Sequence, residues 1–308
     1  MEASLNIFCF SLYLLVLLVG ILGDGFIAGL LCSKWIRGRK LPPCDMILAG
    51  LGASRFLLLW VAMLNGIRAF IFSELYQYHI IFLFFGFLGV VLGLVSFWLA
   101  AGLSVFYCVK ISTFTHPLFL WLKQRISGLV HWFLIGSMLA SCVPIIPVII
   151  GYHIISVQKI ASGNSTKVEG TTFQSHYILI MTFIIFCVPF FLLLSSSIFL
   201  TVSLLRHLRA MQHHHLNLQD CGTKTHTRAL ATLASFLFFY VLYFVFLIFT
   251  SALNSPFDSP WLWLLQIVTY SGPICHAFLL MWSNPKIWGA LEKGLQRVPA
   301  CLTPCGTA

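Results

Sequence analysis

The fold is decided by the first apolar run of the chain, whose residues 7 to 31 read IFCFSLYLLVLLVGILGDGFIAGLL. An apolar helix needs about 20 residues to cross the hydrocarbon core of a bilayer, and this run exceeds that length. It is too long for the apolar core of a secretory signal, which usually spans roughly 7–15 residues, and no basic residue precedes it. We therefore expect a membrane-spanning helix that is retained in the mature protein.

Six more apolar runs of similar length follow, in a chain that is 59% hydrophobic and only 8% charged. Soluble domains carry about a quarter charged residues, so this composition belongs in a bilayer. The runs are continuous rather than alternating, which favours helices over a barrel. We expect an all-α membrane protein, a seven-transmembrane helix bundle that forms a single receptor domain over residues 1–308. Its predicted spans are residues 7–31, 46–72, 80–107, 129–151, 178–205, 229–252 and 261–282.

Basic residues predict which side of the membrane each loop faces, because cytoplasmic loops carry an excess of Lys and Arg. Fourteen of them fall on one side: Lys34, Arg37, Arg39, Lys40, Lys110, Lys123, Arg125, Arg206, Arg209, Lys224, Arg228, Lys286, Lys293 and Arg297. The loops of the other side hold two, Lys159 and Lys167. We expect a multi-pass protein of the plasma membrane with its N-terminus outside and its C-terminus in the cytoplasm.

Several other classes of protein are disfavoured. The net charge of +10 comes from short segments between apolar runs, so we expect no nucleic-acid partner. The cysteines show no CxxC pair, and the run His213-His214-His215 has no acidic or Cys neighbour, so we expect neither a metal nor a cofactor. There is no GxSxG, HExxH or phosphate-binding Gly loop, and the sequence gives no reason to expect an enzyme or a catalytic residue.

Two features concern covalent modification. Asn164-Ser165-Thr166 is a glycosylation acceptor in the predicted second outer loop, residues 152–176, so we expect a glycan on Asn164. Cys301 and Cys305 follow the last span, where palmitoylation and unmodified thiols are both open.

Short motifs in four of the predicted spans occur in a fixed order. They are Leu51-Gly52-Ala53-Ser54-Arg55, then Phe106-Tyr107-Cys108-Val109-Lys110-Ile111 with Phe119-Leu120-Trp121-Leu122-Lys123, then Leu200-Thr201-Val202-Ser203-Leu204 with His207 and Met211, and finally His226-Thr227-Arg228-Ala229-Leu230. Together they resemble the bitter taste receptor family (type 2 taste receptors), and the resemblance covers essentially the whole chain. The D-R-Y, C-W-x-P and N-P-x-x-Y motifs of rhodopsin-like receptors are missing.

The resemblance implies a G-protein-coupled receptor that binds small bitter compounds from outside and activates a gustducin-type G protein. The chain departs from the family pattern at three places. Asp24 stands where the family usually has Asn, and His276-Ala277 replaces a His-Ser pair. Gly86, Gly89 and Gly93 occupy the outer half of the third span, where many members have a Trp, so the size and contacts of the ligand do not follow from the resemblance.

A ligand site between membrane helices is mostly apolar with a few placed polar groups. In the predicted outer halves of the spans, Asn65, Tyr243 and Gln266 fit that description, and Gly89 is the accompanying position on the third span. Each polar residue can instead serve only to bond a neighbouring helix.

At the predicted inner face, the resemblance implies that five residues take part in G-protein coupling or in the switch: Tyr107, Lys110, Ser203, His207 and His226. Lys110 is equally well explained as a topology anchor. His226 can change charge near neutral pH, so we expect it to bond across helices in one state and to be released in the other.

Asp24 and Arg55 are ionisable groups inside apolar spans, where a lone charge costs at least about 2.5–3.5 kcal/mol. With a rise of 1.5 Å per residue, they lie roughly 10 and 14 Å from the inner ends of the first two spans. Spans joined by a short loop are usually neighbours. We expect an interhelical polar pair, in which a buried Asp24–Arg55 ion pair fixes the first span against the second; the alternative is a protonated Asp24 bonded to backbone.

A membrane transporter or channel is the alternative from another class. Such proteins place ionisable groups or broken helices at mid-membrane, often in symmetric halves. The odd number of predicted spans and the lack of a repeat disfavour it. The partners that we expect are small bitter ligands, a heterotrimeric G protein and membrane lipid.

Overall fold

The protein is a bundle of long helices. The computed structural model describes residues 2–71, 80–111, 117–143, 145–147, 149–151, 167–214, 234–235, 237–246, 249 and 260–302, and no strand occurs among them. Within these residues, six helices are long and apolar enough to cross a membrane. They are α1 (Glu2–Ile36), α2 (Pro43–Ile71), α3 (Ile80–Ile111), α4 (Pro117–Cys142), α6 (Lys167–His214) and α8 (Pro260–Ser283).

The described part of the predicted sixth span contains a shorter apolar helix, Leu237–Phe246. With it, the bundle has seven apolar helical segments, in the order and close to the positions that the hydropathy pattern indicated. The prediction of an all-α seven-helix membrane bundle is confirmed.

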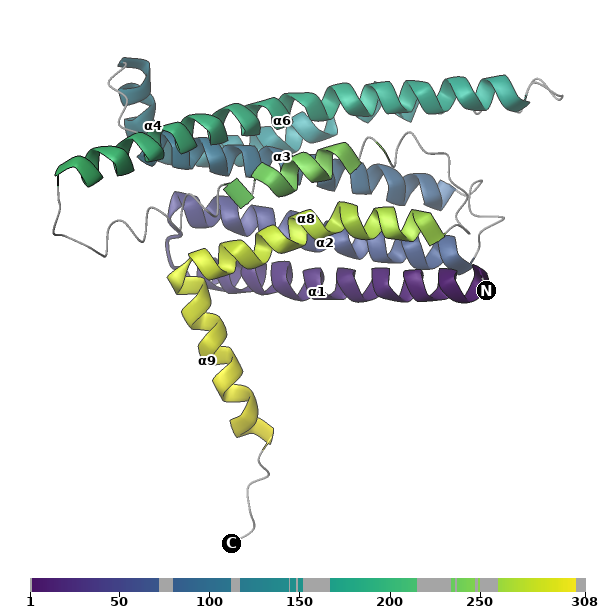
Figure 1. Ribbon diagram of the computed structural model, residues 1–308, viewed down its shortest axis with the longest axis horizontal. Helices are drawn as coiled ribbons and strands as arrows, with labels where there is room; N and C mark the ends of the chain where they lie inside the picture. Colours follow the sequence, from purple (N-terminus) through teal and green to yellow (C-terminus); the bar gives the residue numbers. More distant parts are fainter. Residues whose placement is uncertain are drawn as a thin grey trace, which may run out of the picture.

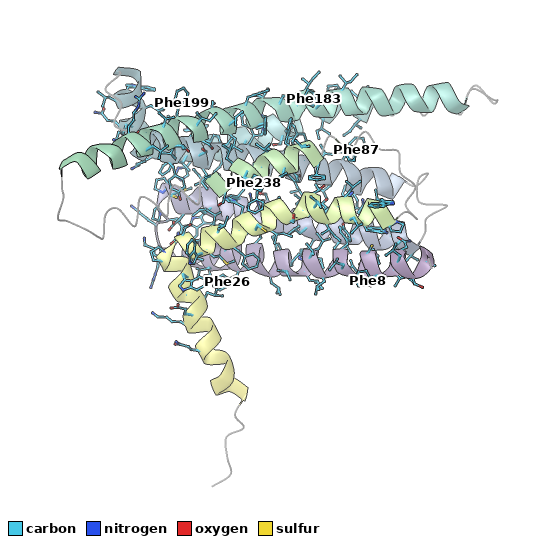
Figure 2. The ribbon with its side chains drawn as sticks, viewed as in Figure 1. Phe8, Phe26, Phe87, Phe183, Phe199 and Phe238 are labelled. Atoms are coloured by element: carbon cyan, nitrogen blue, oxygen red, sulfur yellow. The ribbon has the colours of Figure 1, made fainter. Side chains whose placement is uncertain are left out.

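The helices run side by side along the long axis of the molecule (Figure 1). α1 packs against α2 and α8, while α3 packs against α2, α4 and α6. The outer surface of the bundle is apolar, and the phenylalanines Phe8, Phe199 and Phe238 are each more than half exposed (Figure 2). This surface is the reverse of a soluble protein's and suits a hydrocarbon solvent.

Several helices extend beyond the apolar runs that revealed them, α6 and α4 most of all. α6 spans 48 residues, whereas the apolar run covers only residues 178–205. A helix of that length is about 72 Å long, more than twice the hydrocarbon thickness of about 30 Å. α4 likewise begins at Pro117 rather than near residue 129. Hydropathy marks the thickness of the membrane, and a helix continues beyond it wherever polar residues remain compatible with helical backbone.

The sequence interpretation missed the helix α9 (Pro285–Leu302), which was treated only as a tail. Its start has a regular cap: the Asn284 side-chain Oδ1 accepts a hydrogen bond from the Lys286 backbone N–H at 3.1 Å, and Pro285 occupies the first helical position. α9 is amphipathic, with Ile287 buried and Glu292 and Lys293 exposed, and it leaves the bundle at a steep angle (Figure 1). Its apolar residues recur at a helical period but are too few for a span, which is why a search for spans overlooked it.

Two glycines allow helix backbones to approach closely. A Cβ added to Gly52 of α2 would lie 3.2 Å from the Asp24 backbone oxygen of α1, and one added to Gly272 of α8 would lie 3.0 Å from the Phe239 backbone oxygen. Small residues at such contacts favour helix association in membranes, where van der Waals packing drives assembly.

We predict that Gly52→Val lowers the amount of receptor at the cell surface and its thermal stability in detergent. The added side chain would meet backbone, which cannot move aside without separating α1 from α2, and overpacking of this kind costs about 1–3 kcal/mol. The matched control is Gly29→Val in α1, because a Cβ at that exposed glycine meets nothing within 4 Å. Equal surface labelling of the two variants would contradict the close contact.

Candidate functional site

A buried arginine lies at the centre of the bundle. Arg55 is 1% exposed, although it carries a charge inside an apolar helix. Its Nε donates to the Ser96 Oγ of α3 at 3.2 Å, and its Nη2 donates to the Tyr240 hydroxyl at 2.9 Å. Its Nη1 donates to the Pro273 backbone oxygen at 3.3 Å and contacts the His276 Nδ1 at 2.9 Å, both in α8. One guanidinium thus joins α2, α3, α8 and the Leu237–Phe246 helix.

The contact between Arg55 and His276 fixes the state of the imidazole. A guanidinium has donors only, so the His276 Nδ1 must be the acceptor and the ring proton lies on Nε2. His276 therefore enters this contact as a neutral side chain. Among the described residues, the four acceptors of Arg55 are neutral groups, which solvate the cation without neutralising it.

The expected Asp24–Arg55 ion pair is not formed, and this part of the sequence interpretation is corrected. Asp24 is 1% exposed, but its Oδ2 has no hydrogen-bond partner, and no salt bridge joins the two side chains. Four of the five N–H donors of the guanidinium point instead to Ser96, Tyr240 and α8. Asp24 still lies at the α1–α2 contact, through its backbone oxygen beside Gly52.

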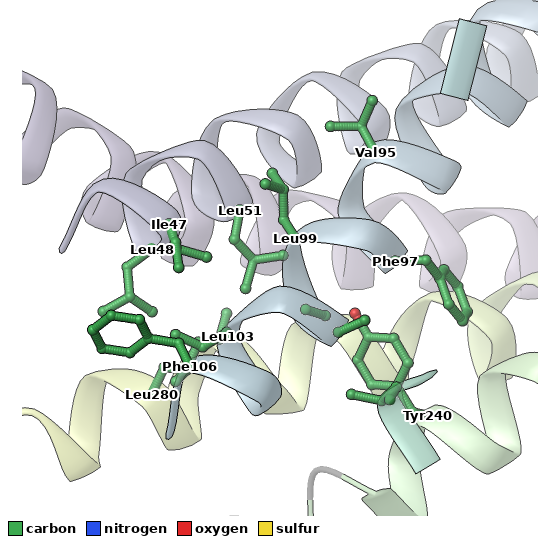
Figure 3. Close-up of a cluster of buried hydrophobic side chains, with 14 of the residues drawn as sticks. Ile47, Leu48, Leu51, Val95, Phe97, Leu99, Leu103, Phe106, Tyr240 and Leu280 are labelled. Atoms are coloured by element: carbon green, nitrogen blue, oxygen red, sulfur yellow. The ribbon is translucent and has the colours of Figure 1, made fainter. Parts of the chain in front are cut away.

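Aromatic rings pack beside this network. Phe97 of α3 contacts Tyr240 with ring centroids 4.9 Å apart, Tyr243 at 5.0 Å and Phe186 of α6 at 5.2 Å. Figure 3 shows Phe97 and Tyr240 among the buried side chains of the core. The rings join α3, α6 and the Leu237–Phe246 helix immediately beside the Arg55 network.

The structure brings together part of the predicted ligand site. Tyr243 is buried, and its hydroxyl lies 3.7 Å from the position of a Cβ on Gly93. A Cβ on Gly89, one turn away, would lie 3.8 Å from the side chain of Val61, which is itself one turn from Asn65. Asn65, Gly89 and Tyr243 therefore lie on adjoining turns of neighbouring helices. Gln266 is half-buried in α8.

The predicted inner face is described only in part. The Tyr107 hydroxyl of α3 accepts a hydrogen bond from the Cys44 Sγ of α2 at 3.3 Å, and the exposed Lys110 holds its Nζ 5.7 Å from the centre of the Phe106 ring. Ser203 is buried in α6. The side chain of His207 lies outside the described residues, as do His226, Asn164 and Cys305, so the roles expected for them stay predictions.

Sequence reasoning missed the acceptors of Arg55. Ser96 and Tyr240 were not singled out, and His276 was noted only as a departure from the family's His-Ser pair. A usable signal existed: an arginine inside an apolar span needs several acceptors, and polar residues are rare in such spans. Which of those residues faced inward could not be read from the sequence, because the helices are apolar on every side.

Seven apolar helical segments around a buried polar centre form a seven-helix membrane bundle, and comparison with known proteins identifies its class. The family model described as Taste receptor protein (TAS2R) matches residues 1–298. Taste receptor type 2 member 134 of Rattus norvegicus is 38% identical over 276 residues, which cover 89% of this chain and 82% of that protein. Member 143 of Rattus norvegicus is 38% identical over 286 residues, covering 91% of this chain and 95% of that protein.

Member 41 of Gorilla gorilla gorilla is 37% identical over 294 residues, which cover 93% of this chain and 94% of the relative. The chain belongs to the taste receptor type 2 family, a family of multi-pass G-protein-coupled receptors. The resemblance drawn from the four motifs is confirmed, and the comparisons give no support to a transporter or channel.

The geometry predicts unequal effects from Asp24→Leu and Arg55→Leu. Asp24→Leu removes a carboxylate whose Oδ2 lacks a partner, so most of the protein should still reach the surface. Arg55→Leu leaves several buried acceptors without their donor, and each costs about 1–3 kcal/mol, so its surface level should fall to a small fraction of wild type. The measurement is surface labelling of both variants beside wild type. Equally severe losses in the two variants would support an Asp24–Arg55 ion pair after all.

Proposed function

We propose that this chain detects small bitter compounds from the extracellular side and activates a G protein of the gustducin type. Membership of the taste receptor type 2 family is the observation that carries the proposal, since the match extends over residues 1–298. The position of Tyr243 supports it, because this half-apolar side chain lies among aromatic rings beside a glycine-lined turn of α3. An apolar site with a few placed polar groups suits a small, mostly apolar ligand.

The same proposal includes the surroundings of the receptor. Exposed apolar side chains such as Leu22 and Trp132, each 73% exposed, are suited to contact with lipid acyl chains. The excess of basic residues in one set of loops supports an N-terminus outside and a C-terminus in the cytoplasm, where a G protein is available. Asn164 would then face the lumen during synthesis and carry a glycan.

The first test is a calcium assay in cells that express the receptor and a gustducin-type α subunit, challenged with a chemically diverse panel of bitter compounds. Gln266→Ala should change the half-maximal concentration of at least one agonist about two- to tenfold, which corresponds to a hydrogen bond of about 0.5–1.5 kcal/mol. Tyr243→Phe should do the same, and neither variant should change surface expression to a similar degree.

Gln296→Ala is the matched control, because Gln296 is exposed on α9 and remote from the proposed site. Normal responses of both site variants to several unrelated agonists would place the ligand elsewhere. The proposed function would be contradicted if the wild-type receptor, shown by surface labelling to reach the plasma membrane, responded to none of the compounds.

The second test concerns the switch. If His226 bonds across helices in one signalling state, removing its side chain should shift the balance between states by about 0.6–2 kcal/mol. A shift of about 1.4 kcal/mol is tenfold, so His226→Ala should change basal signalling or the maximal response severalfold at equal surface level. His213→Ala, from the preceding inner segment, is the control. Unchanged basal and evoked signals in His226→Ala would remove this residue from the switch.

A further inference from the structure

Three buried serine hydroxyls join α3 to α6. Ser104 of α3 is 1% exposed, and Ser196 and Ser197 of α6 are 7% and 1% exposed. The Ser196 Oγ donates to the Ser104 Oγ at 3.0 Å, and the Ser104 and Ser197 hydroxyls share a hydrogen bond of 2.9 Å. We call these three residues the serine clasp. It lies in an otherwise apolar interface, so it is a specific polar link between the two helices.

The hydrogen bonds of the clasp can be broken without leaving a polar group unsatisfied. A helical serine can bond the backbone of its own preceding turn. In this structure Ser54 bonds the Leu51 oxygen at 3.0 Å, and Ser195 bonds the Leu192 oxygen at 3.1 Å. The Ser196 Oγ also lies 3.0 Å from the Leu193 oxygen, so its single O–H has a backbone acceptor available whenever it does not donate to Ser104. A serine that leaves the clasp therefore keeps an acceptor within reach.

Arg55 behaves in the opposite way. Its donors cannot turn to the backbone of its own helix, and removing its acceptors strands a charge in the bundle. The Arg55 network is therefore a permanent link between helices, whereas the clasp costs little to open. A reversible interhelical contact of this kind is what a two-state helix packing requires.

The clasp lies between a possible bend in α6 and the predicted cytoplasmic end of that helix, so opening it can move that end. Pro189 lies seven residues before Ser196 and removes one backbone hydrogen bond, so α6 can bend there. Beyond the clasp, the helix continues to His214, about 25 Å further at 1.5 Å per residue. That arm carries Ser203 and His207, and on α3 the residues Tyr107 and Lys110 follow Ser104 by one and two turns.

The described part of α3 beyond the clasp is largely covered by its neighbours. Phe106, Cys108 and Val109, which follow Ser104 in α3, are 6%, 7% and 2% exposed, whereas Lys110 is exposed. We assign this covered packing to the resting receptor, because signalling requires part of the inner face to become accessible to a G protein.

We propose that Ser104, Ser196 and Ser197 form a reversible clasp that holds the arm of α6 beyond Pro189 against α3 in the resting receptor and opens in the signalling one. Ser104 is then a positioning residue, since it sets where Ser203 and His207 stand relative to α3. This inference rests on the proposed function as a G-protein-coupled receptor and adds to it the site at which the resting packing is held.

The test compares basal signalling of Ser104→Ala, Ser195→Ala and wild type at equal surface level, without any agonist. Loss of an interhelical hydrogen bond worth about 0.6–2 kcal/mol should raise basal signalling about threefold or more in Ser104→Ala. Ser195→Ala is the matched control, because the exposed Ser195 donates to the Leu192 oxygen of its own helix and, among the described residues, to no other helix; it should not change the signal. Ser104→Thr keeps a hydroxyl and should restore low basal signalling.

A second measurement covers the case in which Ser104→Ala does not reach the surface. The double variant Ser104→Cys/Ser197→Cys places two thiols where the hydroxyl oxygens are 2.9 Å apart. Oxidation should lock the clasp and abolish the agonist response, and a reductant should restore it; each single cysteine variant should be insensitive to both treatments. Unchanged basal signalling in Ser104→Ala, or a full agonist response from the oxidised double variant, would overturn the clasp.

These outcomes are distinct from a failure of the proposed function. If the receptor responds to no bitter compound but its basal G-protein signal rises in Ser104→Ala, the clasp is supported and the proposed ligand class is contradicted. If the receptor responds to bitter compounds and Ser104→Ala has no effect, the proposed function is supported and the clasp is contradicted.

Discussion

The burial of one cationic side chain constrains the rest of this structure. Arg55 must find acceptors inside a bundle that is apolar on nearly every surface, and it finds them on three other helical segments. Any packing in which α3, α8 or the Leu237–Phe246 helix moves away from α2 strands a charge or a polar group. The network therefore fixes the relative rotation of these helices far more tightly than apolar packing alone, which tolerates sliding. The aromatic rings of Phe97, Tyr240 and Tyr243 pack against this fixed centre.

The bundle as a whole was predictable because the membrane imposes a length on apolar segments. All seven runs in the sequence correspond to helical segments, and the four motifs pointed to the correct family. The ends of α6 and the existence of α9 were not predictable in this way. Both lie where the membrane no longer constrains the sequence, so that capping groups such as Asn284 and helix-compatible polar residues decide the structure.

At the centre of the bundle, the burial of Asp24 and Arg55 was predicted correctly, but the partners of Arg55 were not. Depth along the helices correctly suggested that Asp24 and Arg55 are both buried near the α1–α2 contact. Depth alone could not show toward which neighbouring helix each side chain points. Helices that are apolar on all sides have no hydrophobic periodicity that would indicate their inward face. The charge of Arg55 was matched to the nearest opposite charge, whereas the structure satisfies it with Ser96, Tyr240, His276 and a backbone oxygen. The mistake shows that hydrogen-bond capacity, rather than charge alone, selects the partners of a buried guanidinium.

The distances along the chain between Arg55 and its acceptors also bear on how the receptor is made. Ser96 follows Arg55 by 41 residues, Tyr240 by 185 and His276 by 221. At a synthesis rate of about 5–20 residues per second, α8 leaves the ribosome roughly 10 to 45 s after α2. During that interval the second helix carries a cation without most of its final partners, at a cost of about 2.5–3.5 kcal/mol that its apolar residues can offset. The Arg55 network can be completed only when the last helix arrives, so the final packing of the inner bundle is a late step of assembly.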